Sequence, residues 1–246
     1  MPFTFSHPAI VLPLRLLPKK WVSLTGLVVG SVVPDFEKFI KMEPGNTISH
    51  TWTGLLWFNL PLGLLLCLVF HQLVRNPLVD HLPGFFRKRL NRFKSFRWIG
   101  YFRKNIPVVV ASVLVGALSH LIWDSFTHKE GHLIQVFPGL SETIALAGLQ
   151  VSTFGLLDHL STLLGLFLLF WEFLKLPVGK VEKRSVKGVW MYWSFVVVTG
   201  FLVVVFRFMP DASGAGQFWD LLITSISALL IGLVVASFLI KYSVTA

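Results

Sequence analysis

Histidine and carboxylate side chains recur at a spacing of four residues in the segment Gly116–His128, which reads G-A-L-S-H-L-I-W-D-S-F-T-H. On a helix, His120, Asp124 and His128 would form one stripe, each one turn beyond the last. A neutral imidazole and a carboxylate at this spacing can bind one metal ion together. Alternatively, His120 and Asp124 only hydrogen-bond to each other. His128 is either a third ligand or an exposed loop residue.

Other ionisable residues that could bind the same metal ion come from segments far apart in the sequence. They are His7 in F-S-H-P-A, Asp35 and Glu37 in G-S-V-V-P-D-F-E, His50 just before an apolar run, and Asp158 with His159 at the start of another. Ionisable groups at a membrane span are unfavourable unless they face the protein interior or water. His7 could instead cap a short helix, and Asp158 could pair with His159 only structurally.

The composition indicates that membrane spans must position these residues. Hydrophobic residues make up 54% of the 246 residues and charged residues 14%, and the mean hydropathy is +0.71. Soluble domains carry about 25% charged residues, so we expect an all-α, polytopic membrane helix bundle.

Five stretches approach the roughly 20 apolar residues that a spanning helix needs. They are Trp52–Phe70, Ile106–Trp123, Leu156–Leu174, Val189–Met209 and Phe218–Ile240. A sixth, Trp21–Val33, is shorter as a helix than the membrane core and is expected to be a re-entrant or interfacial segment. The alternative is that it crosses, which would place Arg15, Lys19 and Lys20 in the cytoplasm. We expect one membrane domain over 1–246, with the motifs in 1–170 and a C-terminal two-helix part in 171–246.

The basic residues predict the orientation. The loop Val74–Asn105 carries nine Lys/Arg and Lys175–Gly188 carries five, whereas His128–Gly155 has one and Pro210–Gln217 has none. Positive loops stay in the cytoplasm, which predicts an inner (cytoplasmic) membrane protein with a cytoplasmic C-terminus. The ionisable residues above would then gather at the outer face. The net charge of +10 is thereby explained by loops near anionic lipid, and no nucleic-acid partner is expected.

Several enzyme classes lack their sequence signatures. The chain has no G-x-S-x-G, no Walker loop, no Rossmann fingerprint and no H-E-x-x-H. An acyl-serine hydrolase, an ATPase and a zincin protease are therefore not supported.

The motifs together resemble those of a known family. The segments are M-P-F-T-F-S-H-P-A, G-S-V-V-P-D-F-E, I-S-H-T-W-T-G-L, the stripe segment and H-L-S-T-L-L-G-L. In this order they resemble an uncharacterised bacterial membrane family, domain of unknown function 4184, over roughly residues 1 to 170. More remotely, the chain is similar to YdjM-type membrane proteins described as metal-dependent hydrolases. Their motifs fall on His7, Asp35 with Glu37, His50, and His120 with Asp124. A second histidine that these relatives often place upstream of His50 is missing.

The residues and the resemblance together favour a membrane-bound, metal-dependent hydrolase. The expected ligands of a divalent metal ion, with zinc first, are His7, Asp35, His50, His120, Asp124 and His159. Glu37 or Asp158 would act as the catalytic general base. A remote likeness to zinc-dependent phospholipase C implies that the partner is a membrane lipid or a lipid-linked small molecule. The alternatives are a transporter and a non-enzymatic membrane protein with a structural metal or polar site.

Overall fold

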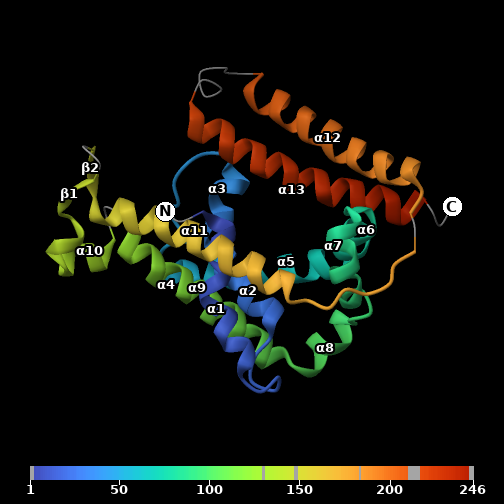
Figure 1. Cartoon of the computed structure of the whole chain (residues 1–246), viewed down its shortest axis with the longest axis horizontal. Coiled ribbons are helices and arrows are strands. Elements are labelled where there is room, and N and C mark those ends of the chain that lie inside the picture. The colour runs from blue at the N-terminus through green and yellow to red at the C-terminus, as the bar shows by residue number, and fades with distance from the viewer. Residues whose placement is uncertain (1–2, 129–130, 147–148, 183, 210–216, 244–246) are drawn as a thin grey trace. The chain divides into compact units, whose positions relative to one another are not determined.

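The fold of the chain is almost entirely helical (Figure 1). The computed structural model describes residues 3–128, 131–146, 149–182, 184–209 and 217–243. The connection expected over Pro210–Gln217 therefore lies almost wholly outside the described residues. The chain divides into two units: residues 1–35, 47–64 and 105–175 form the first, and 36–46, 65–104 and 176–246 form the second.

Five helices are long and apolar enough to cross a membrane. They are Trp52–His81, Ile106–Thr127, Thr153–Leu174, Val186–Phe208 and Phe218–Tyr242. Large apolar side chains on these helices are widely exposed, among them Trp57, Leu163 and Val197. The expected all-α membrane fold is confirmed, and the chain is a multi-pass membrane protein. The first helix differs from expectation, because it continues past Phe70 into the basic segment and ends at His81.

Two wide turns interrupt the first spanning helix. Its parts are α4 (Trp52–Gly54), the π-helical turn η4 (Leu55–Asn59), α5 (Leu60–Val69), the π-helical turn η5 (Phe70–Val74) and α6 (Arg75–His81). Pro61 and Pro77 follow the two turns, and each lacks the backbone N–H that a regular helix would use. The first wide turn contains the fully buried side chain of Asn59, which contributes to the site described below.

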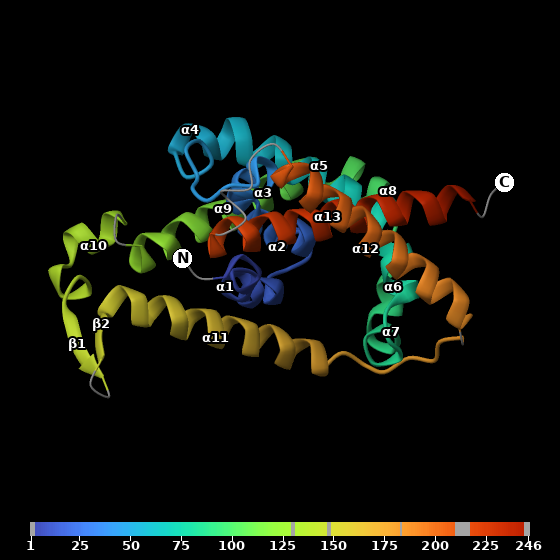
Figure 2. The same cartoon turned by 90° about the horizontal axis from the view of Figure 1, so that it is seen from above.

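The first unit contains the segments that carry most of the motifs. Besides α4 and η4, its elements are η1 (Thr4–Ser6), α1 (Pro8–Val11), η2 (Leu12–Leu16), α2 (Leu24–Val32), η3 (Val33–Asp35), α9 (Ile106–Thr127), α10 (His132–Val136), η7 (Pro138–Leu140), β1 (Thr143–Leu146), β2 (Leu149–Ser152) and α11 (Thr153–Leu174). The strands form an antiparallel hairpin in which Thr143 pairs with Ser152. Figure 2 shows this hairpin at the start of α11.

Helices α2 and α9 pack with their backbones in close approach. A Cβ atom on Gly30 would lie 2.2 Å from the carbonyl oxygen of Val113, and one on Gly116 would lie 2.4 Å from that of Leu27. The backbone N–H of Ser23 also donates to Ser112 Oγ at 2.8 Å. Small residues permit such contacts in membrane helices. The short segment expected over Trp21–Val33 is thus present as α2, fixed against α9.

The N-terminal segment is fixed against α11. The backbone N–H of Phe3 donates to Thr162 Oγ1 at 2.9 Å. A Cβ atom on Gly165 would lie 2.9 Å from the carbonyl oxygen of Ser6, so only glycine admits this approach. These contacts fix the position of the next residue, His7.

The second unit contains the remaining helices. They are α3 (Phe36–Lys41), α7 (Gly84–Leu90), η6 (Asn91–Phe93), α8 (Trp98–Lys104), α12 (Val186–Phe208) and α13 (Phe218–Ser243), together with η5 and α6. Helices α12 and α13 lie side by side (Figures 1 and 2). Tyr192 and Ser237 share a hydrogen bond of 3.1 Å between them, next to the buried Val196 and Ala236. The expectation of one membrane domain over the whole chain stays a prediction.

Candidate metal centre

Five ionisable side chains of the first unit converge on one point. The ligand atoms of His7, Asp35 and His120 lie within 4.8 Å of one another, and so do those of His50, His120 and Asp124. His120 belongs to both groups. The sequence places these residues in four separate segments, and the fold gathers them around one imidazole.

Helix α9 supplies the centre of the cluster. His120 and Asp124 are four residues apart, and His120 Nε2 lies 3.2 Å from Asp124 Oδ2. His120 is fully buried and Asp124 is 5% exposed. The remaining carboxylate, Asp35, ends η3, directly after α2, and its Oδ1 lies 3.7 Å from His120 Nε2. The close packing of α2 on α9 therefore sets the separation of these two carboxylates.

His50 reaches the cluster from a tight turn before α4. The backbone N–H of Thr51 donates to the carbonyl of Ile48 at 3.1 Å, and Thr51 Oγ1 caps the helix by accepting from Gly54 N at 2.9 Å. His50 Nε2 then lies 3.1 Å from Asp124 Oδ2. Asn59 fixes the same turn, because its Nδ2 donates to the Ser49 carbonyl at 2.7 Å.

His7 reaches the cluster from the N-terminal segment. It lies between η1 and α1, is buried, and directs Nε2 to Asp124 Oδ1 at 3.3 Å. Thr4, one turn earlier, donates its hydroxyl to Asp35 Oδ2. The same short segment thus supplies one candidate ligand and orients another.

The three histidines share one arrangement of their ring nitrogens. Nδ1 of His120 lies 2.8 Å from the Ser31 carbonyl oxygen, Nδ1 of His7 lies 3.3 Å from that of Thr4, and Nδ1 of His50 lies 3.1 Å from Ser49 Oγ. A carbonyl oxygen only accepts hydrogen bonds, so Nδ1 of His120 and of His7 must carry the proton. In a neutral ring, Nε2 then presents a lone pair, as it does in histidines that bind metals.

The charges of the cluster favour a cation at its centre. The rings of His7 and His120 stack with their centroids 3.9 Å apart, so protonating both would place two positive charges face to face. Burial lowers the pKa of His7, and His120 lowers it further. If the imidazoles are neutral, their Nε2 lone pairs face the carboxylate oxygens of Asp124 and Asp35, and these groups repel one another. A divalent cation between them would turn that repulsion into ligation.

An unsatisfied nitrogen marks where such a cation would bind. Within the described residues, the fully buried Nε2 of His120 makes no hydrogen bond, although two carboxylate oxygens lie within 3.7 Å of it. A buried polar atom without a partner is unfavourable and rare. Imidazole and carboxylate donors together suit zinc and similar divalent metals. The residues present therefore fit the predicted metal.

Three predicted site residues do not belong to these groups. His159 has a side chain 81% exposed, and its Nδ1 lies 4.0 Å from Oδ2 of its neighbour Asp158, on α11. Glu37 lies on α3 in the second unit, where Lys41 Nζ donates to its Oε1 at 2.9 Å. Adjacency at the start of a span suggested Asp158 and His159, but neighbouring residues on a helix point in different directions.

His128 differs from the expected helical stripe. Helix α9 ends at Thr127, and His128 has an extended backbone. Its side chain still turns back, with Nδ1 3.1 Å from the carbonyl oxygen of Asp124. His128 thus lies next to the cluster, although it is not one of the gathered residues.

The residues that orient the ligands give little signal in the sequence. Ser31 and Thr4 orient the imidazoles of His120 and His7 through backbone carbonyls, which any residue type could supply, so the sequence carries no signal for these contacts. Ser49 directly precedes His50, but a serine at this position is equally typical of a cap before a helix. Asn59, a buried amide in an apolar run, was the one detectable signal, because polar residues in spans need partners.

The fold and the cluster define a multi-pass membrane protein with a buried histidine–carboxylate centre. The chain belongs to the family described as domain of unknown function DUF4184, whose model matches residues 1–238. The match extends the expected similarity beyond residue 170, through most of the C-terminal helices. No curated protein and no solved structure matches the chain.

Proposed function

We propose that the protein is a membrane-bound, metal-dependent hydrolase whose substrate is either a lipid or a phosphate ester. One observation carries the proposal. The Nε2 atoms of three histidines, two with Nδ1 bound to a carbonyl oxygen, converge on the carboxylates of Asp124 and Asp35. Without a metal, hydrogen bonds from Nε2 of His7 and His120 to these carboxylates would require protonated rings, each with a positive charge inside the protein.

Each gathered residue has a definable part. His7, His50, His120, Asp35 and Asp124 would hold a divalent ion, for which zinc is the first candidate. When bound, such an ion lowers the pKa of a coordinated water and polarises the ester oxygen. Asp124 orients the set, since its Oδ1 faces His7 and its Oδ2 faces His50 and His120. In hydrolysis, the water oxygen bonds to the phosphorus or acyl carbon, the ester bond breaks, and the leaving alcohol takes a proton.

His128 is the best-placed residue to accept and return that proton. Because Nδ1 donates to the Asp124 carbonyl, Nε2 is left as the basic nitrogen. The side chain is 34% exposed, so water can reach it. Burial lowers the pKa of His128, which keeps the ring neutral near pH 7. The predicted bases, Glu37 and Asp158, are not among the gathered residues.

The positive loops support a location in the inner membrane with the C-terminus in the cytoplasm. In that orientation the C-terminal end of α9, and with it the cluster, lies towards the outer face. The substrate would then be a lipid or lipid-linked compound of the outer leaflet.

A structural metal site is the second candidate, because Asp35 and His120 are fully buried. A structural site is closed, whereas a catalytic site keeps one position for water. The 24% exposure of the His50 side chain favours access from one side.

The test is hydrolysis by the purified protein in detergent. Phospholipids and polyprenyl phosphates are supplied, with and without a chelator and added zinc. We expect turnover that the chelator removes and zinc restores. His128→Ala should lower kcat about 100-fold or more while the metal content stays unchanged. His159→Ala, with an exposed histidine outside the cluster, is the matched control and should behave as wild type. A bound metal without hydrolysis of any ester would favour the structural site.

A further inference from the structure

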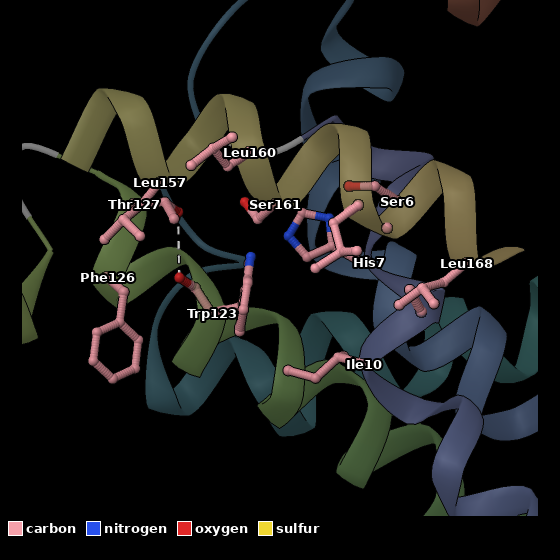
Figure 3. Close-up of a pocket in the computed structure, with 13 residues that line it drawn as sticks. Ser6, His7, Ile10, Trp123, Phe126, Thr127, Leu157, Leu160, Ser161 and Leu168 are labelled. Atoms are coloured by element: carbon pink, nitrogen blue, oxygen red, sulfur yellow. Dashed lines mark hydrogen bonds between the residues drawn. The ribbon is translucent and has the colours of Figure 1, made fainter. Parts of the chain in front are cut away.

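An apolar cavity borders the candidate metal centre. It has a volume of about 470 Å³ and lies between the N-terminal segment, α9 and α11. Figure 3 shows Ser6, His7 and Ile10 on one side, with Trp123 of α9 and Leu160 of α11 among the other walls. His7 belongs to both the cavity and the metal centre, since it lines the cavity and its Nε2 contacts Asp124. We infer that this cavity binds the hydrocarbon chain of the substrate, and this inference rests on the proposed function.

The polar side chains in the wall are already engaged. The hydroxyl of Ser6 donates to the Phe3 carbonyl at 2.7 Å, that of Ser161 to the Asp158 carbonyl at 3.0 Å, and that of Thr127 to the Trp123 carbonyl at 3.2 Å. Both ring nitrogens of His7 have partners as well. Apart from the indole N–H of Trp123, the rest of the wall is apolar or glycine. A sugar, a nucleotide or a free phosphate would find few donors here, whereas a hydrocarbon chain loses nothing by entering.

The position of the cavity gives such a chain a route from the bilayer. Helices α9 and α11 are both long and apolar enough to span the membrane. Two lining residues, Leu160 and Leu164, are 52% and 58% exposed. On a spanning helix these exposed leucines contact lipid, so lipid chains lie next to the cavity. The volume falls in the range of pockets that bury a small ligand.

The shared His7 sets which end of the lipid meets the metal centre. A chain lying along Leu160 and Leu164 would bring the polar group attached to it towards His7 and Asp124. The substrate class is therefore an amphiphile in which the ester group that reacts is attached to a hydrocarbon chain. A water-soluble phosphate ester would leave the cavity empty and lose that binding energy.

Leu164→Trp and its neighbour Leu163→Trp form a matched pair for the test. Both leucines are exposed on α11, at 58% and 67%, but only Leu164 lines the cavity. The larger ring at position 164 should obstruct the cavity, while the ring at 163 should only contact lipid. Leu160→Trp is a second obstructing variant. Metal content and thermal melting of each variant establish that it is folded.

The probe is a phosphatidylglycerol with a photoreactive diazirine in one acyl chain, in vesicles of phosphatidylglycerol and phosphatidylethanolamine. We expect the crosslinks to concentrate on the cavity wall, in residues 123–127 and 157–168. Leu164→Trp should reduce them at least about fivefold and Leu163→Trp should not. In turnover, Leu164→Trp should raise KM for long-chain esters about tenfold and leave short-chain esters unaffected.

Other results would separate this inference from the proposed function. Crosslinks spread evenly along the lipid-facing side of α11, and unchanged by Leu164→Trp, would overturn the chain site. Equal turnover of short-chain and long-chain esters would also overturn it, although the hydrolase proposal would stand. Crosslinks confined to the cavity without any turnover would support the chain site and count against the hydrolase.

Discussion

The imidazole rings of His7 and His120 stack in parallel, with centroids 3.9 Å apart and an interplanar angle of 17°. The two residues are 113 positions apart in sequence, and both rings are turned with Nε2 towards Asp124. Two protonated rings would repel each other at this distance, and two neutral rings would direct lone pairs at a carboxylate. A metal cation shared by these nitrogens and oxygens, as proposed above, would remove both repulsions.

The first prediction concerns metal content. Purified protein should contain about one divalent ion per chain, because His120 is common to both groups of ligands. Asp124→Asn should remove most of it, since the amide keeps the shape of the side chain but lacks its charge. Element analysis of both proteins measures this, with His159→Ala as the control.

Thermal melting of Asp124→Asn separates the two kinds of site. For a catalytic site we expect a modest drop in Tm, because five spanning helices associate through dispersed packing contacts. For a structural site, Tm should fall in step with metal loss, since binding energy is then folding energy. If metal content and melting both stay at wild-type levels, neither a catalytic nor a structural metal site is tenable.

The second prediction concerns the orientation of His50. Ser49→Ala removes the hydroxyl that lies 3.1 Å from His50 Nδ1. Loss of such an orienting partner typically weakens metal affinity 10- to 100-fold. Competition with a chelator of known affinity measures the change. The matched control is Ser119→Ala, whose hydroxyl donates to the Gly116 carbonyl within α9. Equal affinities for the two variants would contradict the role of Ser49.

The third prediction concerns the approach of α2 to α9. Gly30→Ala places a Cβ atom 2.2 Å from the Val113 carbonyl oxygen, so the helices must separate. Overpacking of this kind costs about 1–3 kcal/mol. We expect a lower Tm together with weaker metal binding, because Ser31 directly follows Gly30 and Asp35 lies at the end of the next element, η3. Gly100→Ala on α8 meets no atom within 4 Å and should leave both quantities unchanged. Metal affinity at the wild-type level in Gly30→Ala would show that this packing does not set the site.

The fourth prediction concerns topology. In a background without Cys67, a cysteine at Glu142 should react with a membrane-impermeant thiol reagent in intact cells, and one at Lys88 should react only after lysis. The reason is the excess of Lys and Arg in the loop around residue 88. Both side chains are exposed, so accessibility within the protein does not limit labelling. The opposite pattern would reverse the proposed orientation.

The sequence by itself determined the fold class and the pair of residues at the middle of the centre. Long apolar runs can satisfy their backbone groups in lipid only as helices, so the spanning helices followed from composition. The pair His120 and Asp124 followed from the helical repeat, because its two members lie on one continuous helix.

Only the tertiary structure decided which other residues meet that pair. His7, Asp35 and His50 arrive through the close packing of α2 on α9 and of the N-terminal segment on α11. His159 was as reasonable a candidate as His7 in sequence, yet its side chain is 81% exposed. Which residues meet depends on glycines that let backbones pack closely, on the end of α9 at Thr127 and on carbonyl oxygens that orient the imidazoles. These are relations between segments far apart in the chain, so no local pattern of residues encodes them.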